Sequence, residues 1–245
     1  MQNIDQVISE LEKIKAKCRK KNSPLGFFAL LYYEVTRNVK KGIENQIFED
    51  NARMETLDVI FAKRYIDAFN SYAENRDTTL SWQKAFNHSN NSSLILQHIL
   101  LGINAHINLD LGIAASETMK GQSIEGLEDD FNSINGLLGE MIDDFQSRVN
   151  RVSPLLKWLD RLGGNTDEAI TNFSIQIARK GAWKFTKEFH ISINKEEPLE
   201  NRDGKIANLA EHLSRPKNTW INFLIWVIHL FEKKNNQEVM DILEG

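Results

Sequence analysis

The sequence predicts an all-α fold: a single compact bundle of roughly eight helices around a buried central helix at about residues 94–115. Apolar residues recur at spacings of three and four along most of the chain, which is the period of an amphipathic helix. Only 4 of the 245 residues are proline and 13 are glycine, and no segment alternates apolar and polar residues as a strand would. No internal repeat or Pro/Ser-rich linker divides the chain, so we predict one domain over residues 1–245.

The elements before the central helix follow from apolar spacing and capping residues. One apolar stripe covers residues 4–18. Ser23-Pro24 is an N-cap followed by proline at the first helical position, which predicts a second helix to about residue 42. Asp50 or Asn51 caps a third helix, whose apolar positions run over residues 54–72. A short turn around Trp82 precedes the central helix.

The second half of the chain is expected to continue with helices. Loops are predicted where glycine or polar residues cluster, and the residue before a proline is expected to leave the helical region. The expected elements are a loop over 121–129, a helix from Phe131 to Val149, a short helix from Ser153-Pro154 to Gly163-Gly164, a helix from Thr166 to about His190, a polar loop holding Pro198, and two helices separated at Arg215-Pro216. We expect residues 202–245 to pack on the rest of the bundle.

Composition and charge exclude several classes of protein. The formal net charge of −4 and the pI near 5.9 argue against a nucleic-acid partner, and the single cysteine excludes an intrachain disulfide framework. The first residues do not form a signal peptide, so we expect a cytoplasmic protein. We predict no membrane span: Trp220–Phe231 is too short, and Leu94–Ala115 contains many polar residues that would be costly in hydrocarbon.

Several standard catalytic motifs are absent from the sequence. It contains neither the His-Glu-x-x-His pattern of zinc helices nor a Gly-x-Ser-x-Gly nucleophile elbow. Gly121 and Gly126 have the spacing of the two P-loop glycines, but Leu127-Glu128 follows where Lys-Ser/Thr is required. A function therefore has to be sought in other residues.

The predicted central helix carries two polar stripes. At about 100° per residue, His98, Gly102, His106 and Asp110 fall along one line, while Gln97, Asn104 and Asn108 lie on roughly the opposite side. A helix without an exposed charged face is expected to be buried all round, so its polar groups need partners from neighbouring helices. Gly102 leaves room for a ligand or for close approach of another backbone.

His106 and Asp110 stand one turn apart and are the strongest candidates for chemistry. Their spacing suits a shared metal ion, a proton-transfer pair or a plain hydrogen bond. His98 lies about 12 Å along the helix from His106, so these two histidines cannot bind one ion. A buried carboxylate needs a cation, a donor or a metal, and we expect Asp58, Asp130, Arg64 or Arg179 to approach the same point.

Several stretches resemble a bacterial family known as domain of unknown function 5995. Residues 102–111 (GINAHINLDL) are similar to its "GMNAHINxDL" hallmark. Matching stretches follow in the same order: Leu31–Thr36, Leu57–Tyr65, the aromatic segment Ser81–Phe86, Asp130–Asn135 and Ala178–Trp183. The resemblance covers most of residues 25–190, and it implies a residue list rather than an activity.

The residues that the resemblance implies come from three segments besides the central helix. They are Asp58, Arg64, Tyr65, Asn104, His106, Asn108, Asp110, Asp130, Asn135, Arg179 and Trp183. Within this set, Asp58 and Tyr65 share a helical face, while Arg64 points elsewhere, toward a carboxylate of a neighbouring helix. Arg179 and Trp183 are four residues apart, so we expect the indole to shelter the guanidinium.

Three functions compete at this point. In a metal-assisted hydrolase, His106 and Asp110, with Asp58 or Asp130, would hold a divalent metal that activates water. In a non-catalytic module, an anionic or planar small molecule would be recognised by Arg64, Arg179 and Trp183, with further contacts from Tyr65, Asn104, Asn108 and Asn135.

The third hypothesis is a purely structural polar network in a protein that contacts a partner through its aromatic C-terminal helix. The aromatic residues of that helix are Trp220, Phe223, Trp226 and Phe231. Because the helix is apolar on every side, we predict instead that it packs into the core, with Trp220, Leu224, Val227 and Phe231 in contact with the bundle.

Overall fold

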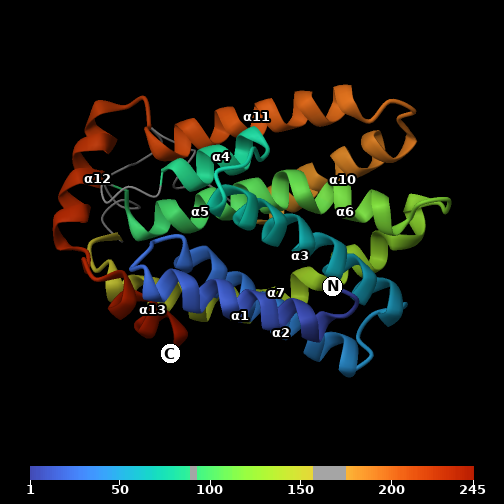
Figure 1. Ribbon diagram of the computed structural model, residues 1–245, viewed down its shortest axis with the longest axis horizontal. Helices are drawn as coiled ribbons and strands as arrows, with labels where there is room; N and C mark the ends of the chain where they lie inside the picture. Colours follow the sequence, from blue (N-terminus) through green and yellow to red (C-terminus); the bar gives the residue numbers. More distant parts are fainter. Residues whose placement is uncertain (89–92, 157–174) are drawn as a thin grey trace.

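The computed structural model describes residues 1–88, 93–156 and 175–245, and within these ranges the chain forms eleven α-helices and no strand (Figure 1). The α-helices are α1 (Ile4–Lys20), α2 (Gly26–Glu44), α3 (Asn51–Ala73), α4 (Leu80–Asn87), α5 (Ile95–Ala105), α6 (Leu111–Thr118), α7 (Glu128–Val152), α10 (Ile175–Ile191), α11 (Glu196–Ser214), α12 (Thr219–Phe231) and α13 (Asn236–Glu244). A π-helical segment, His106–Asp110, joins α5 to α6, and a 3-10 turn, Ile124–Leu127, precedes α7.

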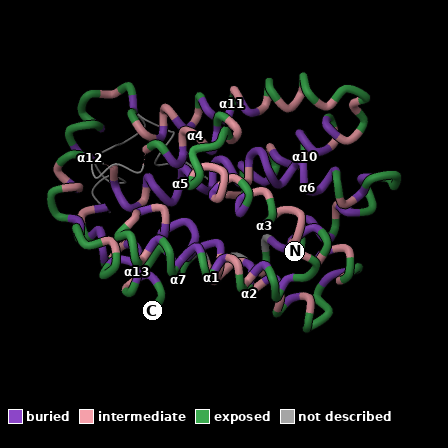
Figure 2. The backbone as a smooth tube through the Cα atoms, viewed as in Figure 1, coloured by how far each residue is buried: buried purple, intermediate pink, exposed green. Residues whose placement is uncertain are grey.

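The expectation of an all-α bundle around a central helix is confirmed. The continuous helical stretch Ile95–Thr118 contacts α2, α3, α4, α10 and α11. It is long and apolar enough to cross a membrane, but 94% of its most apolar window is buried inside the protein. Figure 1 shows it between a layer formed by α1, α2 and α7 and a second layer formed by α10 and α11, and Figure 2 shows that buried residues concentrate along it.

The expected number of about eight helices is wrong for the described residues. The segment around Trp82 is a two-turn helix rather than a turn, and the π segment divides the central helix into two parts. The chain after Pro198 forms three helices rather than two, and Pro198 itself lies in the first turn of α11, where its missing N–H is not required.

The structure confirms one predicted helix start and corrects another. The Asp50 side chain caps α3 by accepting a hydrogen bond from the Arg53 backbone N–H, as expected. Ser23-Pro24 does not begin α2: these residues form a turn, and the helix starts at Gly26. The helix expected to end at Gly163-Gly164 and the cap expected at Thr166 both lie outside the described residues.

Buried carboxylates from distant parts of the chain take over the capping of several segments. Asp203 of α11 accepts hydrogen bonds from the backbone N–H groups of Leu80 and Ser81, which are 2.7 and 2.9 Å away, and so caps α4. Glu232 accepts from the Ile95 N–H at the start of α5 and from Ser153. Because these contacts join residues more than 70 positions apart, they fix how helices sit together as well as satisfying N–H groups.

Gly102 allows α2 to approach the central helix closely. A Cβ built at this position would lie 2.3–2.8 Å from atoms of the Phe28 ring and its Cβ. The Phe28 ring in turn contacts the rings of Tyr65 and His106, at centroid distances of 5.0 and 5.8 Å. Of the two roles expected for Gly102, the structure shows the close approach of another helix.

The prediction that α12 packs into the core with Trp220 and Phe231 in contact with the bundle is wrong for these two residues. Ile221, Leu224, Ile225 and Ile228 pack into the main core cluster, whereas Trp220 and Phe231 are 51% and 62% exposed. Leu224 contacts the bundle as expected, and Val227 is half-buried. Apolar composition all round misled the prediction because a helix at the edge of a bundle has core on one side only.

Replacing Gly102 by alanine should destabilise the protein. The added Cβ overlaps the Phe28 side chain in a fully packed region, so we expect Gly102→Ala to lower the free energy of unfolding by about 1–3 kcal/mol in a chemical denaturation experiment. Gly136→Ala in α7 is the matched control, because a Cβ added at Gly136 would meet nothing within 4 Å. That variant should be unchanged or more stable by about 0.5–1 kcal/mol, and an equal loss in both would contradict the packing argument.

Candidate functional site

The segment His106–Asp110 departs from the regular α-helix that its sequence predicts. The Leu111 backbone N–H donates to the His106 carbonyl, five residues earlier, which is the hydrogen bond of a π-helix. An inserted π turn adds one residue and rotates the helix faces on either side of it relative to each other, and such turns are frequent at functional sites. His106 and Asp110 therefore stand at the two ends of the irregular turn.

The Asp110 carboxylate is buried and fully engaged by hydrogen-bond donors. Arg64 Nε on α3 donates to Oδ1 at 2.9 Å, and Trp82 Nε1 on α4 donates to Oδ2 at 2.8 Å. His106 Nδ1 lies 3.1 Å from the same Oδ2. The expectations that His106 and Asp110 are buried within reach of each other, and that Arg64 meets a carboxylate of a neighbouring helix, are confirmed.

The bond to Asp110 fixes which nitrogen of His106 carries the proton. A carboxylate with three donors acts as an acceptor, so Nδ1 is the N–H and Nε2 is left with a lone pair. Burial lowers the pKa of His106, although Asp110 opposes this shift, and the imidazole is therefore neutral at pH 7. Nε2 is buried and makes no hydrogen bond with any described residue. The ring stacks on Phe61 at a centroid distance of 3.6 Å.

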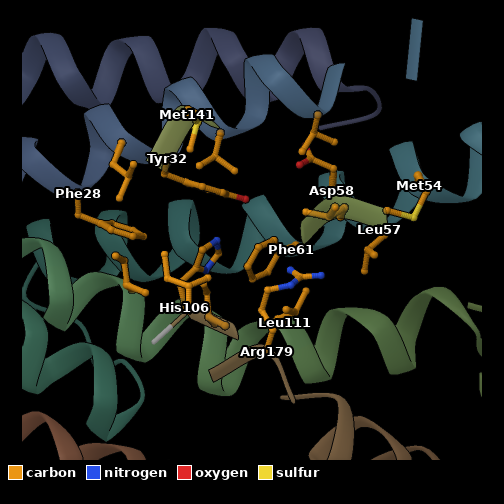
Figure 3. Close-up of a pocket in the computed structure, with 17 residues that line it drawn as sticks. Phe28, Tyr32, Met54, Leu57, Asp58, Phe61, His106, Leu111, Met141 and Arg179 are labelled. Atoms are coloured by element: carbon orange, nitrogen blue, oxygen red, sulfur yellow. The ribbon is translucent and has the colours of Figure 1, made fainter. Parts of the chain in front are cut away.

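His106 lies at the wall of a cavity of about 80 Å³ lined by residues of α2, α3, α7, α10 and the central helix (Figure 3). Most of the lining is apolar, including Met54, Leu57 and Met141. Among the described residues, the polar groups of the lining are Tyr32, Asp58, His106 and Arg179. In Figure 3 they come from opposite sides of the cavity, with Tyr32 and Asp58 facing His106 and Arg179.

Asp58 brings an uncharged carboxylic acid to this cavity. Burial raises its pKa from 3.8 to about 8, and the negative charge of Glu55 adds to the shift. The group is thus protonated at pH 7 and able to donate a hydrogen bond. Its Oδ2 atom is buried and has no hydrogen-bond partner in the described parts of the chain.

Arg179 brings a cation that no described carboxylate neutralises. One Nη donates to the Phe131 carbonyl, the guanidinium lies over the Phe131 ring at 4.5 Å, and Nε has no hydrogen-bond partner among the described residues. Burial alone lowers the pKa of this side chain to about 10. The expectation that the Trp183 indole covers the Arg179 guanidinium is wrong. The Trp183 ring contacts Phe131 and Lys187 instead, because α10 turns Arg179 inward.

Other residues that the sequence analysis grouped with the site lie elsewhere. Asp130 accepts from the Glu49 and Asp50 N–H groups and from Arg53, and so anchors the loop before α3. Tyr65 is not among the residues lining the cavity: it is buried in the aromatic cluster with Trp82 and Phe28, and its ring centroid lies 6.0 Å from that of His106. The side chain of Asn135 lies outside the described residues.

Asn104 and Asn108 serve the opposite face of the central helix. Asn104 donates to the Ile206 carbonyl of α11 and accepts from Asn108, and Gln97 donates to the Leu213 and Ser214 carbonyls at the end of α11. These contacts explain the second polar stripe as a docking surface for a helix. His98 is packed edge-on against Phe27 near Glu232, in a different cavity from His106.

Sequence reasoning missed three side chains that complete the site. Tyr32 and Phe61 wall the cavity, and the Trp82 indole holds Asp110. Tyr32 and Trp82 stand in stretches that carry the family resemblance, which was the available signal. Phe61 also stands in such a stretch, Leu57–Tyr65, but an aromatic residue at helical spacing is ordinarily a core residue, so it was not singled out.

The metal hypothesis does not fit the described geometry. Among the described residues, no group of three or more His, Cys, Asp or Glu side chains is placed to hold an ion. Asp110 already accepts from Arg64, Trp82 and His106, and the Arg64 cation beside it would repel a metal. Asp130 is engaged at the loop before α3, so it brings no further ligand.

Comparison with known proteins identifies one family. A family model described as "Family of unknown function (DUF5995)" matches residues 4–216. No curated protein and no solved structure matches the chain. The family match includes the central helix, the cavity and α11, and it ends before α12.

Removing the charge of Asp110 should destabilise the folded protein. In Asp110→Asn, one acceptor oxygen becomes an amide NH₂ that faces a donor, so we expect the free energy of unfolding to fall by about 2–4 kcal/mol. The matched control is Asp241→Asn, an exposed carboxylate that pairs with Arg19. It should change stability by less than about 1 kcal/mol in the same denaturation experiment. A neutral effect of Asp110→Asn would show that its hydrogen-bond network contributes little.

The raised pKa of Asp58 makes stability depend on pH. The folded state keeps a proton up to pH about 8, whereas an unfolded aspartic acid releases it near 3.8. The protonated carboxyl group of Asp58 therefore stabilises the folded state fully at acid pH, and this stabilisation is lost as the pH rises toward 8. The Asp58→Asn variant lacks this titrating carboxyl group, so its stability should not fall in this way. Between pH 5 and pH 9 its free energy of unfolding should therefore rise by at least about 2 kcal/mol relative to that of the wild type. Parallel pH profiles for the two proteins, as expected for the exposed control Asp67→Asn, would refute this assignment.

Proposed function

The chain belongs to the DUF5995 family, and on that premise we propose that it binds a small anionic molecule in the cavity beside His106, Asp58 and Arg179. The observation that carries the proposal is that four buried polar atoms, on residues that line one mostly apolar cavity, have no hydrogen-bond partner among the described residues: Tyr32 Oη, His106 Nε2, Asp58 Oδ2 and Arg179 Nε. Unpartnered buried polar groups are costly, and a ligand that satisfies several of them at once would offset that cost.

The charge of the cavity argues for an anion. Arg179 remains charged at pH 7, because its pKa is lowered only to about 10. Asp58 is uncharged below pH 8 and His106 is neutral, so neither of these cavity residues neutralises the guanidinium. A carboxylate is the natural complement of an arginine side chain, which presents several donors in one plane.

The size and the apolar lining restrict the rest of the ligand. A cavity of about 150 Å³ in another protein holds benzene, so the 80 Å³ here suits a molecule with only a few non-hydrogen atoms. Leu57, Met54 and Met141 would contact a short apolar body, while His106 Nε2 could accept a hydrogen bond from a hydroxyl or amine on it. Short-chain carboxylic acids, with or without a hydroxyl group, match this description.

Thermal unfolding with a series of short carboxylates tests the proposal. We expect acetate, propionate, butyrate or a hydroxylated analogue to raise the melting temperature, since a ligand at about 100 times its Kd stabilises by about 2.7 kcal/mol. The corresponding neutral amides should not have this effect. Stabilisation should weaken above pH 8, where ionised Asp58 adds a negative charge to the cavity.

Two arginine variants make the test specific. Arg179→Met should stay folded, because it replaces an unneutralised buried cation by an apolar side chain, and it should lose the response to carboxylates. Arg202→Met, on the neighbouring helix α11, removes a bond to the Asn108 carbonyl but does not line the cavity, so it should keep the response. The proposal fails if no carboxylate stabilises the wild type, or if both variants respond as it does.

A further inference from the structure

One face of α12 exposes an unusual set of large apolar side chains. This aromatic face consists of Trp220, Phe223, Trp226, Leu230 and Phe231, which are 51%, 49%, 56%, 54% and 62% exposed. The other side of the same helix packs into the core, so the exposed residues are not free to turn inward without unpacking α12. Exposed apolar patches of this kind mark interaction sites.

The aromatic rings of this face lie next to one another along α12. The Trp220 and Phe223 rings stack at 5.5 Å, and the Phe223 and Trp226 rings lie 6.0 Å apart, so they form one continuous row. Figures 1 and 2 show α12 at one end of the molecule, with exposed residues along its outer side. With 13 residues it is about 20 Å long, too short to span a bilayer but long enough to lie along one.

Basic residues stand at both ends of the aromatic face. Exposed Arg215 and Lys217 precede α12, and exposed Lys233 and Lys234 follow it. Lys233 pairs with Glu238, and Lys234 donates to the His229 carbonyl. Within Thr219–Phe231 there is no acidic residue, and the adjoining Glu232 is buried and turned toward Ile95 and Ser153.

We propose that the aromatic face of α12 docks the protein on the surface of an anionic lipid bilayer. Tryptophan and phenylalanine favour the headgroup region, and lysine and arginine at the ends of a surface-lying helix are attracted to anionic lipids. The site is separate from the cavity, and it lies beyond residue 216, where the family match ends.

The basic residues at both ends of α12 argue against a second copy of the chain as the partner that covers the aromatic face. Two α12 helices packed antiparallel would bring Arg215 and Lys217 of one copy toward Lys233 and Lys234 of the other. Parallel packing would set each basic end against its own equivalent. Both arrangements place like charges together, whereas an anionic surface complements both ends at once.

Vesicle flotation tests this assignment. The full chain should bind vesicles of phosphatidylcholine containing phosphatidylserine, with a shift of tryptophan emission to shorter wavelength, and should bind pure phosphatidylcholine vesicles much less. Phe223→Glu with Trp226→Glu should weaken partitioning by at least about tenfold. Arg215→Glu with Lys217→Glu should weaken binding to the anionic vesicles, and so should high salt.

Matched variants separate this face from general surface effects. Ile191→Glu with Ile193→Glu changes exposed apolar residues that are 79% and 103% exposed, and Lys120→Glu with Lys205→Glu changes exposed lysines outside α12. Both should bind vesicles like the wild type, and circular dichroism should show all variants folded. The proposal is overturned if the wild type does not bind anionic vesicles, or if the α12 variants bind as well as the controls. A dimer in light scattering that these α12 variants dissociate would also overturn it, because the face would then serve self-association.

Discussion

The structure depends on one buried carboxylate. Asp110 lies inside the bundle, and an isolated charge there would be too costly to keep. Its three hydrogen bonds recruit Arg64 from α3 and Trp82 from α4, and they orient His106 within the π segment. The same interaction that joins three helices therefore also decides which nitrogen of His106 faces the cavity.

The two polar stripes of the central helix contact different neighbouring helices. On one side, Gly102 admits Phe28 of α2 and Asp110 holds α3 and α4. On the other side, amide side chains bind backbone carbonyls of α11. Because directional hydrogen bonds specify one arrangement where apolar contacts would tolerate several, these stripes give the bundle its register.

Satisfied and unsatisfied polar groups are unevenly distributed. Asp110, Asp130 and Asp203 are buried with several donors each, which is what a stable interior requires. Asp58 and Arg179 are equally deep, but each has an atom without a partner, and both line the same cavity. A protein that can pair three buried carboxylates has no need, for stability alone, to leave Asp58 Oδ2 and Arg179 Nε without a partner among the described residues, and this contrast is the physical basis for assigning them a ligand.

The sequence by itself determined the helical class, the central helix and the pairing of His106 with Asp110, because helical periodicity fixes which side chains share a face. It also placed Arg64 against a neighbouring carboxylate, since a buried charge must find a partner. Only the tertiary structure decided the π turn, the neutral state of Asp58, the contact of Arg179 with Phe131 and the outward face of α12. Each of these depends on what other helices bring within a few ångströms, and the spacing of residues along one helix carries no information about that.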